Sequence, residues 1–148
     1  MENSQLARAE QVHAERVVTA MLRDDAFSRM LGMELVSVTP GNATVRLTVR
    51  DDMVNGLGVC HGGVTFSLAD SALAFASNGH GRVTVSIENS IGYPAAVRVG
   101  DVITAAATEE SAGRRLAFYN VTVRKQDATT VAIFRGTVYR TDKEHAQG

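Results

Sequence analysis

The sequence predicts an α+β protein in which an antiparallel β-sheet curls around one long apolar helix. Three observations predict this fold. Residues 63–77 form a segment that would be apolar on nearly every side of a helix. Residues 43–50 alternate strictly between apolar and polar side chains, as a half-buried strand does. The chain after residue 82 has the pattern of four further strands separated by turns. Because an apolar helix must be covered, we expect a sheet of five to six strands to wrap around it.

The expected elements follow one another as one helix, two strands, the apolar helix and four strands. The N-terminal segment 1–31 is helical from residue 5, because it holds good helix formers and no Gly or Pro. A turn at "TPGN" (39–42) separates the first two strands. We expect one domain over 1–148, ending in a polar, disordered tail at 142–148. The expected strands are 33–38, 43–50, 82–92, 101–111, 114–125 and 130–140.

Composition narrows the classes of function. Fifteen basic and sixteen acidic residues leave a net charge of −1, so the chain has no basic footprint for nucleic acid or for an anionic membrane. The single cysteine, Cys60, cannot form an internal disulfide, and we expect it to be a small buried hydrophobic residue. The histidines are too scattered for a zinc site, and no segment has the pattern of a signal peptide or a membrane span. We therefore expect a cytoplasmic protein without a metal or a cofactor.

One carboxylate, Asp70, lies in the middle of the apolar helix. An ionised side chain in such a place is costly unless another group pairs with it, and no basic residue lies within one helical turn. One interpretation is structural, with Asp70 as a hydrogen-bond acceptor or at a subunit interface. A desolvated carboxylate with a raised pKa is also the usual form of a general base or a nucleophile. We favour a function for Asp70.

The segment "HGG" (61–63) leads into the same helix and supplies complementary chemistry. The amides of residues 62–64 point out of the helix N-terminus, where they can stabilise an oxyanion, and glycine lets a substrate oxygen approach. A plain turn before a helix has the same pattern. Gly63 and Asp70 are seven residues apart, or about 10 Å along the helix, too far for both to touch one carbonyl group. Two antiparallel copies across a dimer axis meet this geometry, so we expect the site at a dimer interface.

Three segments carry a resemblance to a known family. They are "MVNGLGVCHGGVTFSLADSALAFASNG" (53–79), "RVGD" (98–101) and "VAIFRGTVYR" (131–140). In this order they resemble the hotdog-fold acyl-CoA thioesterases, specifically the PaaI-type (phenylacetic acid degradation) branch. The match of fold pattern covers nearly the whole chain from about residue 25. The resemblance implies a sheet around a central helix, paired into homodimers that assemble to homotetramers.

The resemblance also implies catalytic roles. Asp70 matches the catalytic acid of the family, and Gly63 matches the glycine whose backbone N–H polarises the thioester carbonyl. Asn55 matches a residue that assists near that carbonyl, although a turn residue is the alternative. His61 matches the motif histidine, whose role is structural or orienting.

Further residues are expected to bind the substrate. Ser86 falls where some relatives hold a water-positioning Ser or Thr, with Thr84 as the alternative. Gly62 and Ser71 lie beside the residues above and are expected to contact the substrate. Two arginines in the turn "SAGRRL" are candidates for the CoA phosphates, because planar donors suit phosphate, although a solvated hairpin tip has the same composition. These arginines are Arg114 and Arg115.

The loop "IGYPAAVRVGD" (91–101) departs from relatives that have Arg-Pro after an aromatic residue, so contacts to the CoA phosphates do not carry over in detail. Four aromatic side chains can line an acyl pocket or belong to the core, and the core is the better single interpretation of each. They are Phe66, Phe75, Tyr93 and Phe118.

We expect the chain to hydrolyse acyl-CoA thioesters to the free acid and CoA, with aryl, phenylacetyl-type or hydroxylated phenylacetyl-CoA as substrate. Asp70 acts as a general base or as a nucleophile, and CoA is part of the substrate rather than a cofactor. The alternatives are a medium-chain fatty acyl-CoA thioesterase and a non-catalytic acyl-CoA sensor. A dehydratase of the same fold would need a His and a carboxylate in an "HFPG"-like loop, which the sequence lacks.

Overall fold

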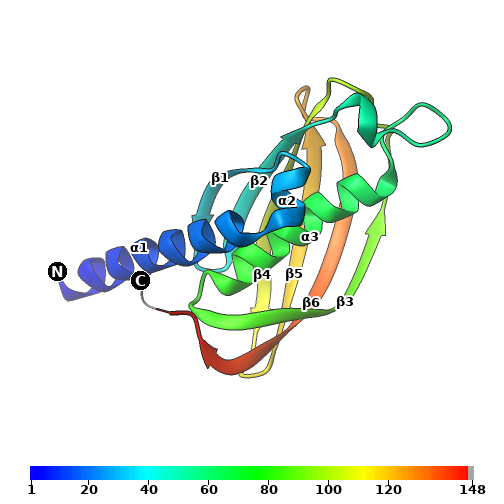
Figure 1. The fold of residues 1–148 in the computed structure, drawn as a ribbon. Coiled ribbons are helices and arrows are strands. Elements are labelled where there is room, and N and C mark those ends of the chain that lie inside the picture. The colour runs from blue at the N-terminus through cyan, green and yellow to red at the C-terminus, as the bar shows by residue number, and fades with distance from the viewer. Residues whose placement is uncertain (147–148) are drawn as a thin grey trace.

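The computed structural model describes residues 1–146, and its elements form one sheet wrapped around one helix (Figure 1). The helices are α1 (Glu2–Asp24), α2 (Ala26–Met30) and α3 (Gly62–Asn78), with a short 3-10 turn at Asp51–Met53. The strands are β1 (Glu34–Thr39), β2 (Asn42–Thr48), β3 (Arg82–Gly92), β4 (Val102–Ala112), β5 (Leu116–Lys125) and β6 (Thr130–Glu144). They pair antiparallel in the order β1-β2-β4-β5-β6-β3. The predicted α+β fold, with a sheet of six strands around a long central helix, is confirmed.

The core lies between α3 and the concave face of the sheet. In β2, Val45 and Leu47 are buried while Arg46 between them is exposed, because successive side chains of a strand face opposite sides. Many of the facing side chains are alanines, which let the helix and the sheet approach closely. The core includes Leu68, Ala69, Ala72, Leu73 and Ala76 of α3, with Ile103, Ala105 and Ala107 of β4. This packing fixes α3 and therefore the residues on its remaining face.

The N-terminal segment forms two helices, which corrects the continuous helix expected over residues 5–31. The break falls at Asp25, whose side chain accepts hydrogen bonds from the backbone N–H and the hydroxyl of Ser28 at 2.9 Å and 2.6 Å. Asp25 is therefore the N-cap of α2, a position with non-helical backbone. α1 is buried only in its second half, from Ala14 onward. Across residues 1–146, no helix is both long enough and apolar enough to cross a membrane.

β6 is longer than expected and extends into the segment predicted to be a disordered tail. Its last residue, Glu144, pairs with Arg82 at the start of β3. The N–H of His145 donates to the carbonyl of Gly81, just before β3, and its ring forms a hydrogen bond with Asn78 at the end of α3. The prediction of disorder is therefore wrong for residues 142–145, because pairing with a distant strand orders a polar sequence. Residues 147 and 148 of that predicted tail lie outside the described part of the chain.

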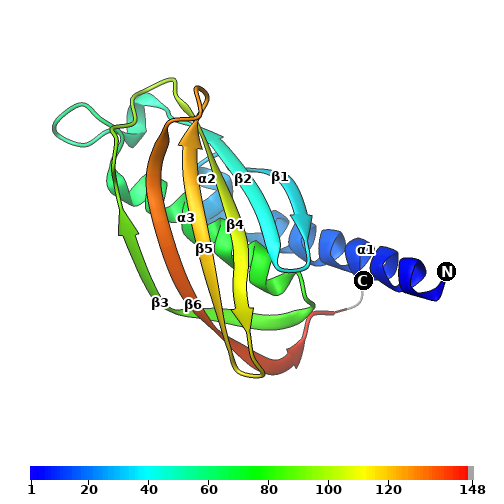
Figure 2. The same ribbon diagram turned by 180° about the vertical axis from the view of Figure 1, so that it is seen from behind.

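β3 forms one edge of the sheet and contains a β-bulge. Its register against β6 shifts between Ser86 and Glu88, so Ile87 is an extra residue on this strand. Val85 and Ile87 are 48% and 57% exposed, which leaves apolar side chains on a long sheet edge. Figure 2 shows that no helix covers the convex face of the sheet. An open edge with apolar side chains is a surface on which sheets of this kind pair with another chain.

Candidate active site

Asp70 lies in the middle of α3 and is half-buried. Its Oδ1 accepts a hydrogen bond from Asn89 Nδ2 of β3 at 3.3 Å, whereas its Oδ2 has no hydrogen-bond partner among residues 1–146. Burial raises the pKa of the Asp70 carboxyl; the hydrogen bond from Asn89 opposes this rise, and the negative charge of Asp25 adds to it. A carboxylate with a raised pKa and one free oxygen can take a proton from water or attack a carbonyl carbon.

One face of α3 is left partly open. On it Gly63 is exposed, and Ser67, Asp70 and Ala74 are only partly buried, at the spacing of three and four residues that defines one side of a helix. Leu68, on another side of the helix, is fully buried. The carboxylate and the helix start therefore share a face but lie two turns, or about 10 Å, apart.

At the start of α3, the free backbone amide is that of Gly62 and not that of Gly63, as was expected. His61 caps the helix, and its Nδ1 accepts a hydrogen bond from the Gly63 N–H at 2.9 Å. The expectation that the Gly63 amide is open to a substrate carbonyl is therefore wrong for this structure, because the cap occupies that donor. The N–H of Gly62 has no partner within the described chain, and it points out of the positive end of the helix. His61 thus orients the first turn and leaves Gly62 as the open donor.

Tyr93, in the loop after β3, holds the same peptide unit from the other side. Its hydroxyl donates a hydrogen bond to the Gly62 carbonyl at 2.9 Å. A hollow of about 360 Å³ lies beside this contact, lined by Cys60, Gly62, Thr65, Tyr93 and Val97 among others. Cys60 is 8% exposed, as predicted for a small buried hydrophobic residue, and burial raises the pKa of its thiol. The thiol is therefore protonated at neutral pH and is a poor nucleophile.

The other three aromatic residues divide between the core and its margin. Phe75 is 1% exposed and belongs to the core, in keeping with the preferred interpretation. Phe66 is half-buried and packs edge-on against Phe134, with ring centroids 5.4 Å apart. Phe118 is partly buried on β5. The core interpretation is wrong for Tyr93, which is 49% exposed and contacts the start of α3.

Asn55 lies at the base of the loop that precedes α3, where Val54 and Cys60 form a β-bridge. Its Oδ1 accepts hydrogen bonds from the backbone N–H groups of Leu57 and Val59, at 2.9 Å and 3.3 Å. The side chain therefore acts as a turn residue in this chain. Its amide Nδ2 donates to no other described residue, so it remains open to a substrate oxygen. Leu57, in the same loop, is 88% exposed.

The remaining predicted residues on and near α3 take three different positions. Ser71 forms a hydrogen bond of 2.8 Å with the hydroxyl of Ser28 on α2, so its side chain connects two helices of the same chain. Ser86 donates to Asn89 Oδ1 at 2.9 Å and is thus linked to Asp70 through one intervening side chain. Thr84, the alternative to Ser86, is buried; its N–H donates to Asn78 Oδ1 at the end of α3, and its hydroxyl donates to the Arg82 carbonyl.

The two predicted phosphate-binding arginines lie far from the start of α3. Their hairpin joins β4 to β5 at the end of the sheet where α3 ends, as the hydrogen bond from Arg82 to the Arg114 carbonyl shows (Figure 1). Arg115 pairs with Asp142 at 2.9 Å and lies over the ring of Tyr139, so its guanidinium is engaged within the chain. Arg114 is exposed, and its side chain pairs with no described residue. Within one chain, the structure does not bring these arginines to Asp70 or Gly62.

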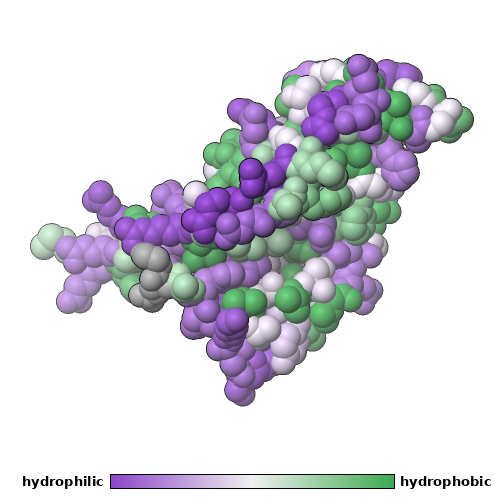
Figure 3. All heavy atoms as spheres, in the orientation of Figure 1, coloured by the Kyte–Doolittle hydropathy of each residue, from purple (hydrophilic) through white to green (hydrophobic). Residues whose placement is uncertain are grey.

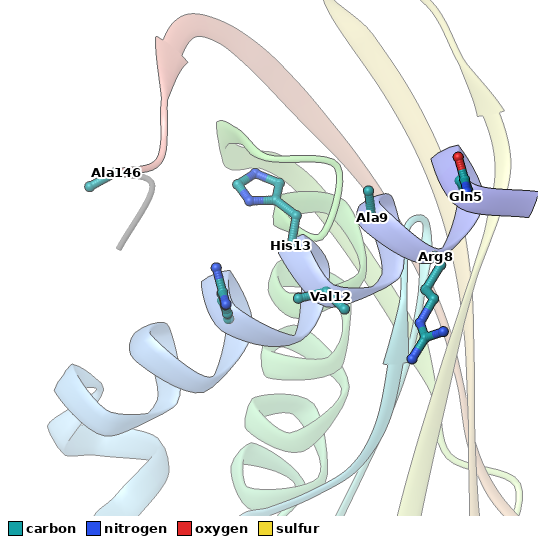
Figure 4. A pocket seen from close by; sticks show the side chains of 7 residues that line it. Gln5, Arg8, Ala9, Val12, His13 and Ala146 are labelled. Atoms are coloured by element: carbon teal, nitrogen blue, oxygen red, sulfur yellow. The ribbon is translucent and has the colours of Figure 1, made fainter. Parts of the chain in front are cut away.

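Two open hollows, of about 550 Å³ and 1050 Å³, lie along α1. Figure 4 shows the smaller one, between the side chains of Gln5, Arg8 and His13 and Ala146, the last residue that the structure describes. None of the predicted site residues lines either hollow. Figure 3 shows hydrophilic residues along the outer side of α1. Among residues 1–146, no three His, Cys, Asp or Glu side chains gather closely enough to hold a metal ion.

Comparison with known proteins identifies the family of the chain. The family model described as the thioesterase superfamily matches residues 57–132. The acyl-coenzyme A thioesterase PaaI of Escherichia coli K12 is 38% identical over 121 residues, covering 82% of this chain and 86% of that protein. The solved structure of the E. coli PaaI protein from the phenylacetic acid degradation operon superimposes with a TM-score of 0.89, covering 90% of this chain and 97% of that one at 35% identity. A Streptococcus mutans protein solved with acetyl-CoA bound has a TM-score of 0.74 at 29% identity, covering 76% and 91%.

The chain belongs to the thioesterase superfamily, and it is an enzyme of the PaaI type with the hotdog fold. The predicted resemblance is confirmed by the same findings. One site residue that the motifs did not indicate is Asn89, the hydrogen-bond partner of Asp70. Its only sequence signal is a polar residue within the strand segment "SIENSIG" (86–92), which by itself points to no role.

Proposed function

We propose that this chain hydrolyses acyl-CoA thioesters to the free acid and CoA, with aryl and phenylacetyl-type acyl groups, including hydroxylated ones, as its substrates. The observation that carries the proposal is that α3 bears both a half-buried carboxylate with one free oxygen and an N-terminal amide that has no partner in the described chain. These are Asp70 and Gly62. The hollow beside Gly62, bordered by apolar side chains and the ring of Tyr93, suits a flat acyl group. The names of the E. coli relative and the acetyl-CoA complex of the S. mutans protein support the substrate class.

In the general-base route, Oδ2 of Asp70 takes a proton from water while the water oxygen bonds to the thioester carbon. The carbonyl oxygen becomes an oxyanion that accepts a hydrogen bond from the Gly62 N–H. When the intermediate collapses, the C–S bond breaks, and the proton on Asp70 passes to the departing sulfur. In the nucleophilic route, Oδ2 itself attacks, CoA leaves as the thiolate, and water then hydrolyses the anhydride. The free Oδ2 serves both routes.

The site requires two copies of the chain. Because Asp70 and Gly62 are eight residues apart on one helix, about 12 Å separates them and no single carbonyl group reaches both. An antiparallel α3 from a second copy places the Gly62 of each chain opposite the Asp70 of the other. The exposed edge of β3 and the partly open face of α3 are the surfaces that this dimer buries, and two dimers form a homotetramer.

The first experiment measures thiol release from a panel of aryl- and fatty acyl-CoA esters by the wild type, Asp70→Asn and Asp24→Asn. Loss of the base lowers the rate about 10²–10⁴-fold in Asp70→Asn. Asp24, whose side chain is 71% exposed, is the matched control, and its substitution leaves the rate unchanged. If the enzyme prefers medium-chain fatty acyl esters, these take the place of aryl and phenylacetyl-type esters as its substrates. Binding without hydrolysis by the wild type would make the chain an acyl-CoA sensor and Asp70 structural.

A second experiment tests the amide donor. Gly62 is the first residue of α3, where proline fits a helix, so Gly62→Pro removes only the N–H and adds the ring. Gly62→Ala adds a Cβ but keeps the N–H, and it is the matched control. Loss of an oxyanion donor lowers the rate about 10²–10³-fold in the proline variant. Equal rates in the two variants would contradict this role.

The same variants test the shared site. In a 1:1 mixture of Asp70→Asn and Gly62→Pro chains, half of the dimers are mixed, and each mixed dimer holds one intact site. The mixture therefore recovers about a quarter of the wild-type activity, as a symmetric interface with sites shared across it requires. If each chain carries its own complete site, the mixture stays inactive.

A further inference from the structure

The Asn89 side chain bridges two residues with which no motif connects it. Its Nδ2 donates to Asp70 Oδ1 at 3.3 Å, and its Oδ1 accepts from the Ser86 hydroxyl at 2.9 Å. The chemistry of the two partners fixes the orientation of the amide, because a carboxylate oxygen cannot donate to the amide oxygen. Both ends of Asn89 are therefore engaged, in the order Ser86, Asn89, Asp70.

Two features of the backbone position the Asn89 side chain. Residues three apart on a regular strand face opposite sides of a sheet. The bulge at Ile87 adds one residue, so Ser86 and Asn89 face the same side. On the paired strand, Asn89 lies opposite Gly136, and a Cβ at Gly136 would come within 2.7 Å of Asn89 Oδ1. Only glycine leaves room for the amide at this point.

The contact has two consequences for Asp70. It restrains the carboxylate through Oδ1 and leaves Oδ2 as the free oxygen. It also stabilises the ionised form, because the amide donates a hydrogen bond to the carboxylate. Burial and the charge of Asp25 both favour the protonated form, so Asn89 acts against them. A neutral donor does this without adding a positive charge, which would make the carboxylate a weaker base.

We propose that Asn89 is a positioning residue of this enzyme, which holds Asp70 as a carboxylate with Oδ2 directed to the substrate. The proposal rests on the proposed function for the reaction that Asp70 performs. The effect of the hydrogen bond on the ionisation of Asp70 can be tested without any substrate.

The substrate-free test follows the carboxyl ¹³C signal of Asp70 through a pH titration, with the signal assigned by its loss in Asp70→Asn. In Asn89→Ala the pKa of Asp70 rises by about one pH unit, the effect of losing a hydrogen bond to a charged group. In Asn89→Asp, which adds a second carboxylate in place of the donor, the rise is larger. Ser90→Ala, at the neighbouring exposed residue, is the matched control and leaves the titration unchanged.

The activity test measures kcat/KM against pH for the same chains. The acid limb of the profile moves to higher pH in Asn89→Ala by the amount seen in the titration, and Ser90→Ala keeps the wild-type profile. A well-folded Asn89→Ala with an unchanged Asp70 titration overturns the proposal. If that variant does not fold, Asn89→Asp decides: it keeps the size of the side chain and replaces the amide donor by a carboxylate, and an unchanged Asp70 pKa in this variant also overturns the proposal. If the wild type hydrolyses no thioester, the proposed function fails, while the carboxyl titration still judges Asn89.

Discussion

Gly136 should be among the glycines of this chain least tolerant of substitution. A Cβ at this position would lie 2.5 Å from Leu73 Cδ2 of α3 and 2.7 Å from Asn89 Oδ1. Both distances are well inside normal contact, and Leu73 is fully buried, so α3 or the Asn89 side chain must shift. Overpacking of this kind costs about 1–3 kcal/mol, and the better strand backbone of alanine returns roughly 0.5–1 kcal/mol. We expect Gly136→Ala to lose about 1–2 kcal/mol of unfolding free energy, or about 3–6 °C in Tm for a chain of this size.

The matched control is Gly92→Ala at the end of β3, where an added Cβ meets nothing within 4 Å. Thermal unfolding followed by circular dichroism compares the two variants with the wild type, and Gly92→Ala should stay within about 0.5 kcal/mol of it. Adding Asn89→Ala to Gly136→Ala removes one of the two clashes, so the penalty of the alanine at position 136 should be smaller in that background. A Gly136→Ala chain as stable as Gly92→Ala would refute the reasoning.

Three further outcomes are expected. Burial raises the folded-state pKa of Asp70 above its unfolded value, so the stability of the wild type falls as pH rises from the unfolded to the folded pKa. Asp70→Asn should therefore be more stable than the wild type at pH 7, and the difference should be gone near pH 3. A variant less stable than the wild type at pH 7 in denaturant titrations would contradict this. Tyr93→Phe removes the hydrogen bond to the Gly62 carbonyl and should lower kcat about fivefold, the worth of one neutral hydrogen bond, whereas an unchanged kcat in steady-state assays would show that the contact is dispensable. Burial raises the pKa of the Cys60 thiol. A thiol reagent at pH 7.5 should therefore label the folded chain at least about tenfold more slowly than the urea-unfolded chain. Equal labelling rates would mean that the thiol is accessible in the folded chain.

The architecture could be predicted because its signals are local. The alternation in β2 and the apolar length of α3 each determine one buried face, and together they leave few arrangements other than a sheet around a helix. For the same reason, the predicted ends of the helices and strands lie within a few residues of the observed ones. The exceptions were the break at Asp25, where one capping side chain overrides helix propensity, and the end of β6, where polar residues are ordered by pairing with β3.

The candidate site was predictable only in part. Asp70 stands out in the sequence because a lone carboxylate in an apolar helix needs an explanation. Which of the two amides, Gly62 or Gly63, is open to the substrate depends on which N–H the His61 ring accepts a hydrogen bond from. The spacing of residues in the sequence does not reveal this. Asn89 depends on a bulge and on a glycine of another strand, 47 positions further along the chain, so no local pattern could indicate it.

The first half of α1 has a consequence for local stability. Residues 2–10 are all exposed, and the first buried residue of the helix is Ala14. An isolated helix of that length is marginal in water, so these turns persist because they propagate from the packed half without a new nucleation step. Their amide protons should exchange with solvent in a gradient, fastest at the N-terminus and slowest near Ala14, independently of global unfolding. This end of the helix can therefore fray and re-form while the sheet, α3 and the site remain intact.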